Sequence, residues 1–295
     1  MPRIPGGLTV MRSVERAPGF AAALLTPLGL LYCVCLLAPI SYFLAVSFLR
    51  YSPDQLYTST FTLDNYTRLL FDPYNQNVIF GTFRIAATVT LITLVLGYAL
   101  AYFLSRASPA WRALLMFLVI APLMTGVIVR TYGWIVLLGG DGLINRLLLA
   151  LGLVSRPLLL LNSEATVVVA LTHLMLPFMT FPIFSALVTQ DPLLVPAAST
   201  LGARSLRAFF EVTVPLSRSG IVMGSVLVFT LSAGSVVTPA LLGGRTVMMM
   251  GQMIYQLVLS TFNWPLASAF AAVLVFCQFL VVFAYLRRAR NVAQP

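Results

Sequence analysis

Six apolar runs constrain this chain more than any other feature of its sequence. They cover about 21–48, 78–104, 112–138, 165–188, 219–242 and 266–287. Each run is long enough to cross the hydrocarbon core of a bilayer as an α-helix, which takes roughly 20 apolar residues. Only 9% of the residues are charged, whereas a soluble domain has roughly 25%. We therefore expect an all-α membrane protein with six transmembrane helices over 21–287, between short tails at 1–20 and 288–295.

The first and the interrupted runs need separate treatment. The first run is much longer than the apolar core of a signal peptide, roughly 7–15 residues, and is predicted to stay as a helix. Pro122 and Pro177 lie inside the third and fourth runs. Membrane helices tolerate proline because neighbouring helices and water satisfy the freed carbonyl groups.

The arginines divide unequally between the two sides of such a bundle. With six crossings, eleven of the 18 basic residues fall on one side, namely Arg3, Arg12, Arg16, Arg106, Arg112, Arg204, Arg207, Arg218, Arg287, Arg288 and Arg290. The other side holds Arg50, Arg68, Arg146, Arg156 and Arg245 beside Asp54, Asp64, Asp72, Asp141 and Glu164. Because arginine accumulates in cytoplasmic loops, both termini are predicted to be cytoplasmic. The net charge of +10 then has its origin in these loops, and we expect contact with membrane lipid and no nucleic-acid partner.

Two segments on the predicted outer side have helical periodicity. One reads FTLDNYTRLLFD and carries Leu63, Tyr66 and Leu70; the other reads DGLINRLLLALGL. Both patterns predict short amphipathic helices at the outer interface. Two interpretations stay open, packing caps over the bundle or a docking surface for an external partner.

The spans lack the groups that would let this chain drive transport by itself. No Asp or Glu lies within the six runs, although ion-coupled carriers usually need an intramembrane carboxylate. The chain has no lysine, which excludes a P-loop and a lysine Schiff base. Cys33, Cys35 and Cys277 lie in apolar runs, and we expect neither a disulfide nor a metal site. Transport energy would therefore come from another chain; an ion-coupled secondary carrier is the alternative, and a membrane enzyme is disfavoured.

The loop at 189–218 is the longest on the cytoplasmic side and suits contact with such a chain. Asp191-Pro192 predicts a turn, Pro196 suits a first helical position, and Gly202 would end that short helix or admit a partner's backbone. A second helix is expected to follow, with an apolar ridge, and to stop or bend at Pro215. Its ridge would consist of Leu206, Phe209 and Phe210. An ordinary amphipathic connector is the other interpretation.

This loop resembles the EAA loop of binding-protein-dependent ABC importer permeases. Ala197 and Ala198 match the two alanines of that family's pattern, and Gly202 matches its glycine. Val212, Val214 and Pro215 fall at its I-x-L-P positions, whereas Pro196 replaces its glutamate. Segments such as TLDNYTRLL, LGYALAYFLSR, LPFMTFPIFSAL and WPLASAFA extend the resemblance over nearly the whole chain, in particular to the spermidine/putrescine branch.

The resemblance implies a fold, partners and a site. It implies the type I architecture in a bacterial inner membrane, with a second permease, a periplasmic solute-binding protein and an ATPase dimer as partners. No cofactor is expected on this chain, since ATP and Mg²⁺ would be bound by the ATPase, and the permease would not be an enzyme. The residues expected to couple to the ATPase are Pro196, Ala197, Ala198, Leu201, Gly202, Ala203, Leu206, Phe209, Val212, Val214 and Pro215.

A few polar or aromatic residues in the spans are hypotheses for contact with solute. Arg130, followed by Tyr132 and Trp134, either lines the translocation path or reaches the outer headgroups beside an aromatic belt. His173 is interpreted as a hydrogen-bonded packing residue, and pairing with an outer carboxylate is a hypothesis for Arg84 that the sequence does not decide. The Gly- and Met-rich segment 243–256 is either a flexible gate or a packed re-entrant loop.

Overall fold

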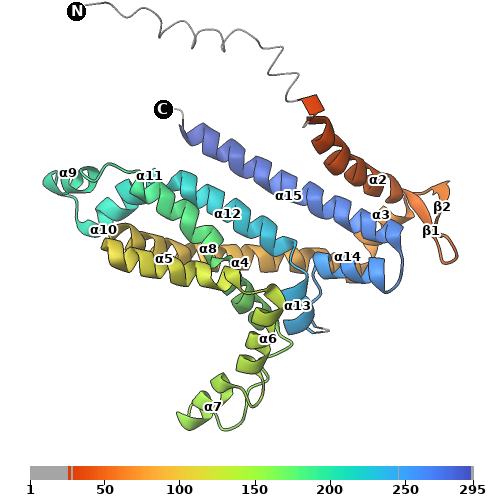
Figure 1. Cartoon of the computed structure of the whole chain (residues 1–295), viewed down its shortest axis with the longest axis horizontal. Helices are drawn as coiled ribbons and strands as arrows, with labels where there is room; N and C mark the ends of the chain where they lie inside the picture. The colour runs from red at the N-terminus through yellow and green to blue at the C-terminus, as the bar shows by residue number, and fades with distance from the viewer. Residues whose placement is uncertain (1–25, 28, 245, 294–295) are drawn as a thin grey trace, which may run out of the picture.

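The protein is a helical bundle with distinct ends. The computed structural model describes residues 26–27, 29–244 and 246–293. In Figure 1, α4 (Pro73–Arg106), α8 (Glu164–Val188), α12 (Arg218–Ala233) and α15 (Trp264–Ala293) form the body of the bundle. One end carries α9 (Leu194–Thr200) and α10 (Ser205–Ala208), and α15 terminates toward that end. The other end carries α3 (Asp64–Phe71), α14 (Met250–Leu259) and a β-hairpin. The prediction of a helical membrane protein is confirmed.

The longest helices begin where the sequence provides caps. The carboxylate of Asp72 accepts hydrogen bonds from the amides of Tyr74 and Asn75, directly before α4. The hydroxyl of Ser163 accepts from the amide of Thr166 at the start of α8. Such side chains satisfy amides that have no partner within the helix. These helices enclose the predicted runs 78–104 and 165–188, and α15 encloses 266–287 and continues into the predicted tail.

Two predicted spans are divided. The run 112–138 contains most of α5 (Pro109–Met124) and all of α6 (Val127–Leu138), and 219–242 contains most of α12 and all of α13 (Val237–Leu242). Thr125 and Gly126 have extended backbone, which interrupts the helical hydrogen bonds after α5. Among the described residues, five helices are long and apolar enough to cross a membrane, or six if one bent pair at Ser205–Leu216 and Arg218–Ala233 counts as a span.

The first predicted run is helical over Gly29–Val46. This stretch includes η2 (Cys33–Leu37) and α2 (Ala38–Val46). Residues 21–25 of the predicted run lie outside the described part of the chain, as does the predicted tail 1–20. The helical stretch ends in a feature that the sequence interpretation missed, an antiparallel hairpin of β1 (Leu49–Ser52) and β2 (Leu56–Phe61). The buried amide of Asn65 donates to the carbonyls of Ser47 and Leu49 and fixes the hairpin to α3.

Both amphipathic helices predicted for the outer side are present. One is α3, and the other is α7 (Leu143–Ala150). Asn145 of α7 is fully buried. Its amide group donates to the carbonyls of Gly139 and Leu158 and accepts from the amide of Leu158. A single side chain therefore closes the loop between α6 and the segment that leads to α8.

Close helix contacts hold the centre of the bundle. Met179 of α8 lies between Gly97 of α4 and Gly224 of α12, where an added Cβ would come within 2.9 and 2.8 Å of its side chain. Gly220 of α12 lies directly against the backbone of α8 at Pro182 and Ile183. Small residues permit such approach in a membrane, where packing replaces the hydrophobic effect between helices. We call α4, α8 and α12 the central trio.

The segment around α13 and α14 is packed, in agreement with the packed-loop interpretation of 243–256. The backbone amide of Asn162 donates to the carbonyl of Leu242 at 2.9 Å, and the backbone carbonyl of Asn162 accepts from the hydroxyl of Thr246 at 2.5 Å. Met249 and Met250 are fully buried. The described part of this segment is therefore packed against the bundle. Its Arg245 lies outside the described residues.

Candidate functional site

The predicted coupling loop consists of short helices joined by one tight corner. Its first helix, α9, begins at Leu194, two residues before the predicted start at Pro196. The carboxylate of Asp191 explains this start, because it accepts a hydrogen bond from the amide of Leu193 at 2.9 Å. Within α9, Pro196 and Ala197 are exposed and Ala198 is half-buried. The turn predicted at Asp191-Pro192 is present before it.

Gly202 makes the corner after α9, as predicted. Its φ of +89° is in the left-handed region, which costs glycine nothing. The amides of Gly202 and Ala203 donate to the carbonyls of Ser199 and Ala198, the pattern of a Schellman motif. Within the described part of the chain, no atom lies within 4 Å of a Cβ placed on Gly202. The corner at Gly202 is thus accessible to the backbone of another protein.

The prediction that Leu206, Phe209 and Phe210 form one apolar ridge on the second helix is wrong, because the three side chains do not face the same way. Leu206 and Phe210 are 74% and 64% exposed. Phe209 points the other way, with its ring edge-on to those of Tyr98 and Tyr102 on α4. The helix is not regular either, since η3 (Phe209–Thr213) is a π-helical turn, and this wider winding changes which side chains share a face. The outward apolar surface of the loop is therefore Leu201, Leu206 and Phe210.

The end of the loop bends later than predicted. Val212 and Val214 are half-buried, and Pro215 is an exposed residue of α11 (Val214–Leu216). Proline fits there because the first turn of a helix needs no donor from it. The chain bends by 65° between this segment and α12, around Ser217, which is fully buried.

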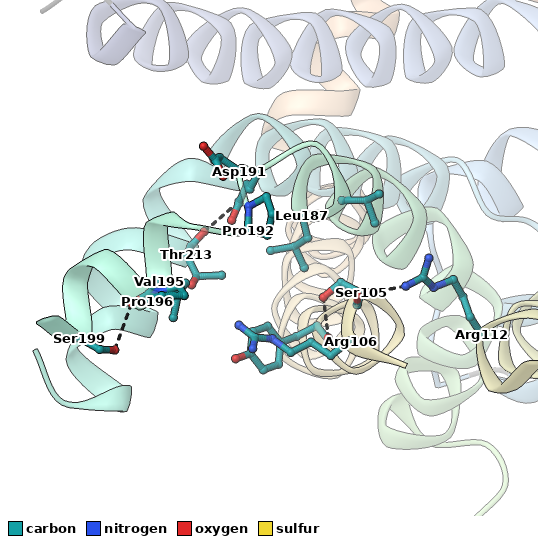
Figure 2. A pocket seen from close by; sticks show the side chains of 13 residues that line it. Ser105, Arg106, Arg112, Leu187, Asp191, Pro192, Val195, Pro196, Ser199 and Thr213 are labelled. Carbon is teal, nitrogen blue, oxygen red and sulfur yellow. Dashed lines mark hydrogen bonds between the residues drawn. The ribbon is translucent and has the colours of Figure 1, made fainter. Parts of the chain in front are cut away.

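A cavity of about 600 Å³ separates α9 from the ends of α4 and α8. Figure 2 shows Pro196 and Ser199 on one wall and Arg106 and Arg112 on the other. Arg112 donates to the carbonyls of Leu104, Ser105 and Ala107, so that it caps the C-terminus of α4. Arg106 lies over the ring of Tyr102, 4.9 Å from its centre. The arginines on this wall are thus held by the end of α4, and α9 forms the opposite wall of the cavity.

The three residues proposed for the solute path do not share a face. Arg130 lies in the first turn of α6 and donates to the carbonyl of Thr125 at 2.7 Å, which satisfies the end of α5. Trp134 packs toward the core and is edge-on to His173, with ring centres 5.7 Å apart. Tyr132 points away from the core and is 56% exposed. His173 therefore has the packing contact expected for it, but its buried Nδ1 lacks the expected hydrogen bond among the described residues. Tyr132 is separated from the other two.

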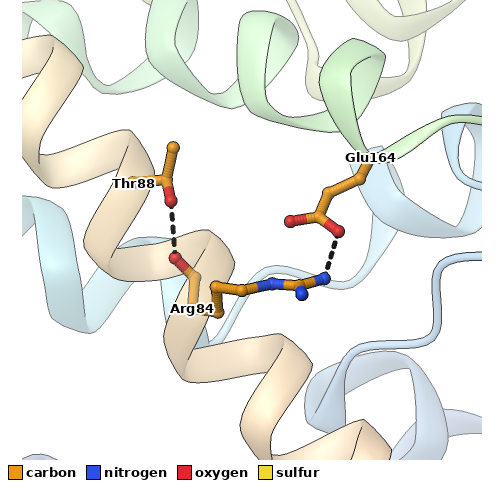
Figure 3. A network of polar contacts seen from close by, with 3 residues as sticks. All are labelled: Arg84, Thr88 and Glu164. Carbon is orange, nitrogen blue, oxygen red and sulfur yellow. Dashed lines mark hydrogen bonds and ion pairs between the residues drawn. The ribbon is translucent and has the colours of Figure 1, made fainter.

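The ion pair expected for Arg84 is present at the other end of the bundle. Arg84 of α4 bonds Glu164, the first residue of α8. Figure 3 shows the pair bridging the two helices beside Thr88, whose hydroxyl donates to the carbonyl of Arg84. A cavity of about 420 Å³ adjoins the pair and is also lined by Tyr74. Within the described ranges, no group of three His, Cys, Asp or Glu is placed to hold a metal ion.

Comparison with known proteins finds relatives that match most of the chain. No protein-family model matches the chain. It is 38% identical over 244 residues to the spermidine/putrescine transport system permease protein PotB of Haemophilus influenzae, covering 83% of this chain and 85% of that protein. It is 34% identical over 247 residues to PotB of Escherichia coli, covering 84% and 90%.

A solved structure has the same fold. It is the bacterial alginate ABC transporter in complex with an alginate pentasaccharide-bound periplasmic protein. The TM-score is 0.74 at 15% identity, over 96% of this chain and 98% of that one. At this identity, the similarity establishes the fold alone.

Proposed function

Because the chain belongs to the family of ABC importer permeases that includes the spermidine/putrescine permease PotB, we propose that it is one of two membrane subunits of an importer for a polyamine or a related small solute. The second subunit would be a similar permease. The permease itself performs no chemical step. It alternates access between the two sides of the membrane as a separate ATPase dimer binds and hydrolyses ATP with Mg²⁺.

The coupling loop is the observation that carries this proposal. It presents Leu201, Leu206 and Phe210 outward around an open glycine corner, and Leu201 is 89% exposed. A hydrophobic knob at the end of a bundle is an expected docking element for a cleft in another protein. One ATPase subunit would receive the segment 196–215, with Pro196 in place of an acidic contact.

The proposed orientation of the protein in the membrane rests on the distribution of arginine between the two ends of the bundle. The described arginines Arg106, Arg112, Arg204, Arg207 and Arg218 belong to the end that carries α9 and α10, and α15 terminates toward it. Since arginine is retained on the cytoplasmic side, we place this end and both termini in the cytoplasm of a bacterium. The opposite end, with α3, the hairpin and α14, would then receive a periplasmic binding protein.

Gly202→Asp tests the proposal. Aspartate tolerates the left-handed backbone better than most residues, so the protein should reach the membrane at normal levels. It adds a charge to the exposed corner, and we expect uptake of radiolabelled spermidine to fall at least tenfold, together with loss of the co-purified ATPase. Normal uptake at normal expression would contradict the proposed coupling site.

Gly152→Asp is the matched control. Gly152 also has a positive φ, +70°, and among the described residues nothing lies within 4 Å of its Cβ position. It follows α7, which projects from the bundle beyond α6 and away from α9 and α10 (Figure 1), so the same substitution should leave ATPase binding intact. Uptake that persists without any ATPase and disappears with a protonophore would instead support the secondary carrier.

A further inference from the structure

The bend at Ser217 is bonded to α4 by one tyrosine. The hydroxyl oxygens of Tyr98 and Ser217 lie 3.0 Å apart. Ser217 also donates to the carbonyl of Val214 at 3.0 Å. Because a serine hydroxyl has a single proton, the Tyr98 hydroxyl must be the donor in the bond to Ser217. The junction between the coupling loop and α12 is therefore held by a directional bond from the neighbouring helix.

An aromatic contact lies beside this hydrogen bond. The Phe209 ring is edge-on to Tyr98 and Tyr102, with centroids 5.6 and 5.2 Å away. The two tyrosines are four residues apart and face the same way on α4. Edge-on aromatic pairs are favourable in this range of separations. Among the described contacts, Phe209 joins the loop to α4 through its ring and Ser217 joins it through a hydrogen bond.

The residue before Tyr98 connects this contact to the rest of the bundle. Gly97 lies against Met179 of α8, which also touches Gly224 of α12. Movement of the loop at Tyr98 is consequently transmitted to tightly packed helices rather than absorbed by a mobile side chain. Ser217 is the last residue before α12, so the same hydrogen bond fixes how that helix leaves the loop.

We propose that Tyr98 is a positioning residue for energy coupling, whose hydroxyl bond to Ser217 makes the loop and the central trio move together when the ATPases close. This inference rests on the proposed function. Tyr98 contacts neither solute nor nucleotide in this role. It determines what fraction of ATP-driven loop movements is converted into reorientation of the bundle.

The chain contains a matched pair of variants for the test. Tyr98→Phe removes the hydroxyl and keeps the ring against Phe209. Tyr102→Phe makes the same change one turn away, where the described contacts include no hydrogen bond to the Tyr102 hydroxyl. Each variant would be reconstituted as the full complex in proteoliposomes with spermidine-loaded binding protein. ATP hydrolysis and spermidine transport would be measured in the same vesicles.

We expect Tyr98→Phe to lower the spermidine transported per ATP by about threefold to tenfold, the range for loss of one hydrogen bond. ATP hydrolysis should remain, and Tyr102→Phe should match the wild type. Ser217→Ala should lower the ratio similarly, and adding Tyr98→Phe to it should have no further effect. Equal ratios for Tyr98→Phe and Tyr102→Phe, or a lower yield of complex at an unchanged ratio, would overturn the inference. Absence of ATP-dependent uptake by the wild type would instead overturn the proposed function, so the two failures are distinguishable.

Discussion

Helices α8 and α5 are both apolar, yet they have opposite places in the fold. In the described chain, twelve of the 25 residues of α8 are buried, whereas none of the 16 residues of α5 is. The partners of α8 have glycines where they meet it, at 97, 220 and 224. The surface of α5 instead presents large side chains, Trp111, Leu114, Phe117, Leu118 and Met124.

This difference shows what apolar composition determines in a membrane protein. A run of apolar residues specifies a helix in lipid, because lipid and a protein core are equally apolar surroundings. Burial within one chain depends on small residues that let another backbone approach. The large exposed side chains of α5 would be left for lipid or for the proposed second permease.

The largest effect is expected from truncating methionine on each helix. Met179 of α8 is fully buried, and Met124 of α5 is 77% exposed. Met179→Ala should destabilise the folded chain by about 2–5 kcal/mol, the range for a buried large-to-small change. Met124→Ala should change it by less than about 0.5 kcal/mol. Thermal unfolding of the purified protein in mild detergent measures both, and similar losses would show that α5 is packed after all.

The second-largest difference is expected for glycine-to-alanine substitutions, which should destabilise the chain at a packed helix and stabilise it at an exposed one. Gly220→Ala places a methyl group against the backbone of α8, 2.8 Å from the Cα of Ile183, and should cost about 1–3 kcal/mol. Gly133 of α6 has no atom within 4 Å of its Cβ position among the described residues. Gly133→Ala should therefore stabilise by up to about 1 kcal/mol, the helix propensity of alanine. The same unfolding assay applies, and a loss at both positions would contradict the distinction.

The smallest effect is expected at the rim of the central trio. Arg84 and Glu164 join α4 to α8, but their side chains are 67% and 38% exposed. Arg84→Gln should destabilise the chain by less than about 1 kcal/mol, because solvent-exposed ion pairs contribute little. Glu164→Gln should destabilise the chain by a similar amount, and the double variant should be no less stable than either single variant. A loss above 2 kcal/mol in unfolding experiments would show that charge, and not packing, joins these helices.

The sequence was sufficient for features that depend on local chemistry. Spans such as 165–188 follow from apolar length, since only a helix satisfies its backbone in lipid. The corner at Gly202 follows from the conformational freedom of glycine. The cost of an unpaired charge near the membrane suggested an outer carboxylate as the partner of Arg84, but only the structure identifies that partner as Glu164.

Features that depend on neighbours in space were not predictable in this way. The inward turn of Phe209 requires the rings of Tyr98 and Tyr102, which lie more than a hundred positions earlier in the chain. The extended backbone at Thr125 has no distinctive residue pattern. The hairpin before α3 does have a signal that was overlooked, since Pro53 and Asp54 favour a turn and β2 is rich in Tyr, Thr and Phe. Tyr132 was grouped with Arg130 and Trp134 by proximity in sequence, although residues two apart on a helix point to different sides.

The bond between Thr82 and α14 has a consequence for how the protein is made. The Thr82 hydroxyl accepts from the amide of Met250, 168 residues later, and donates to the carbonyl of Val78 in its own helix. At roughly 5–20 residues per second, the ribosome needs about 8–34 seconds to synthesise the residues in between. During this interval the hydrogen bond to Val78 satisfies the Thr82 hydroxyl group within its own helix. The start of α14 obtains its acceptor only after α4 is in place, so the packed segment of α13 and α14 should be among the last parts of a newly synthesised chain to assemble.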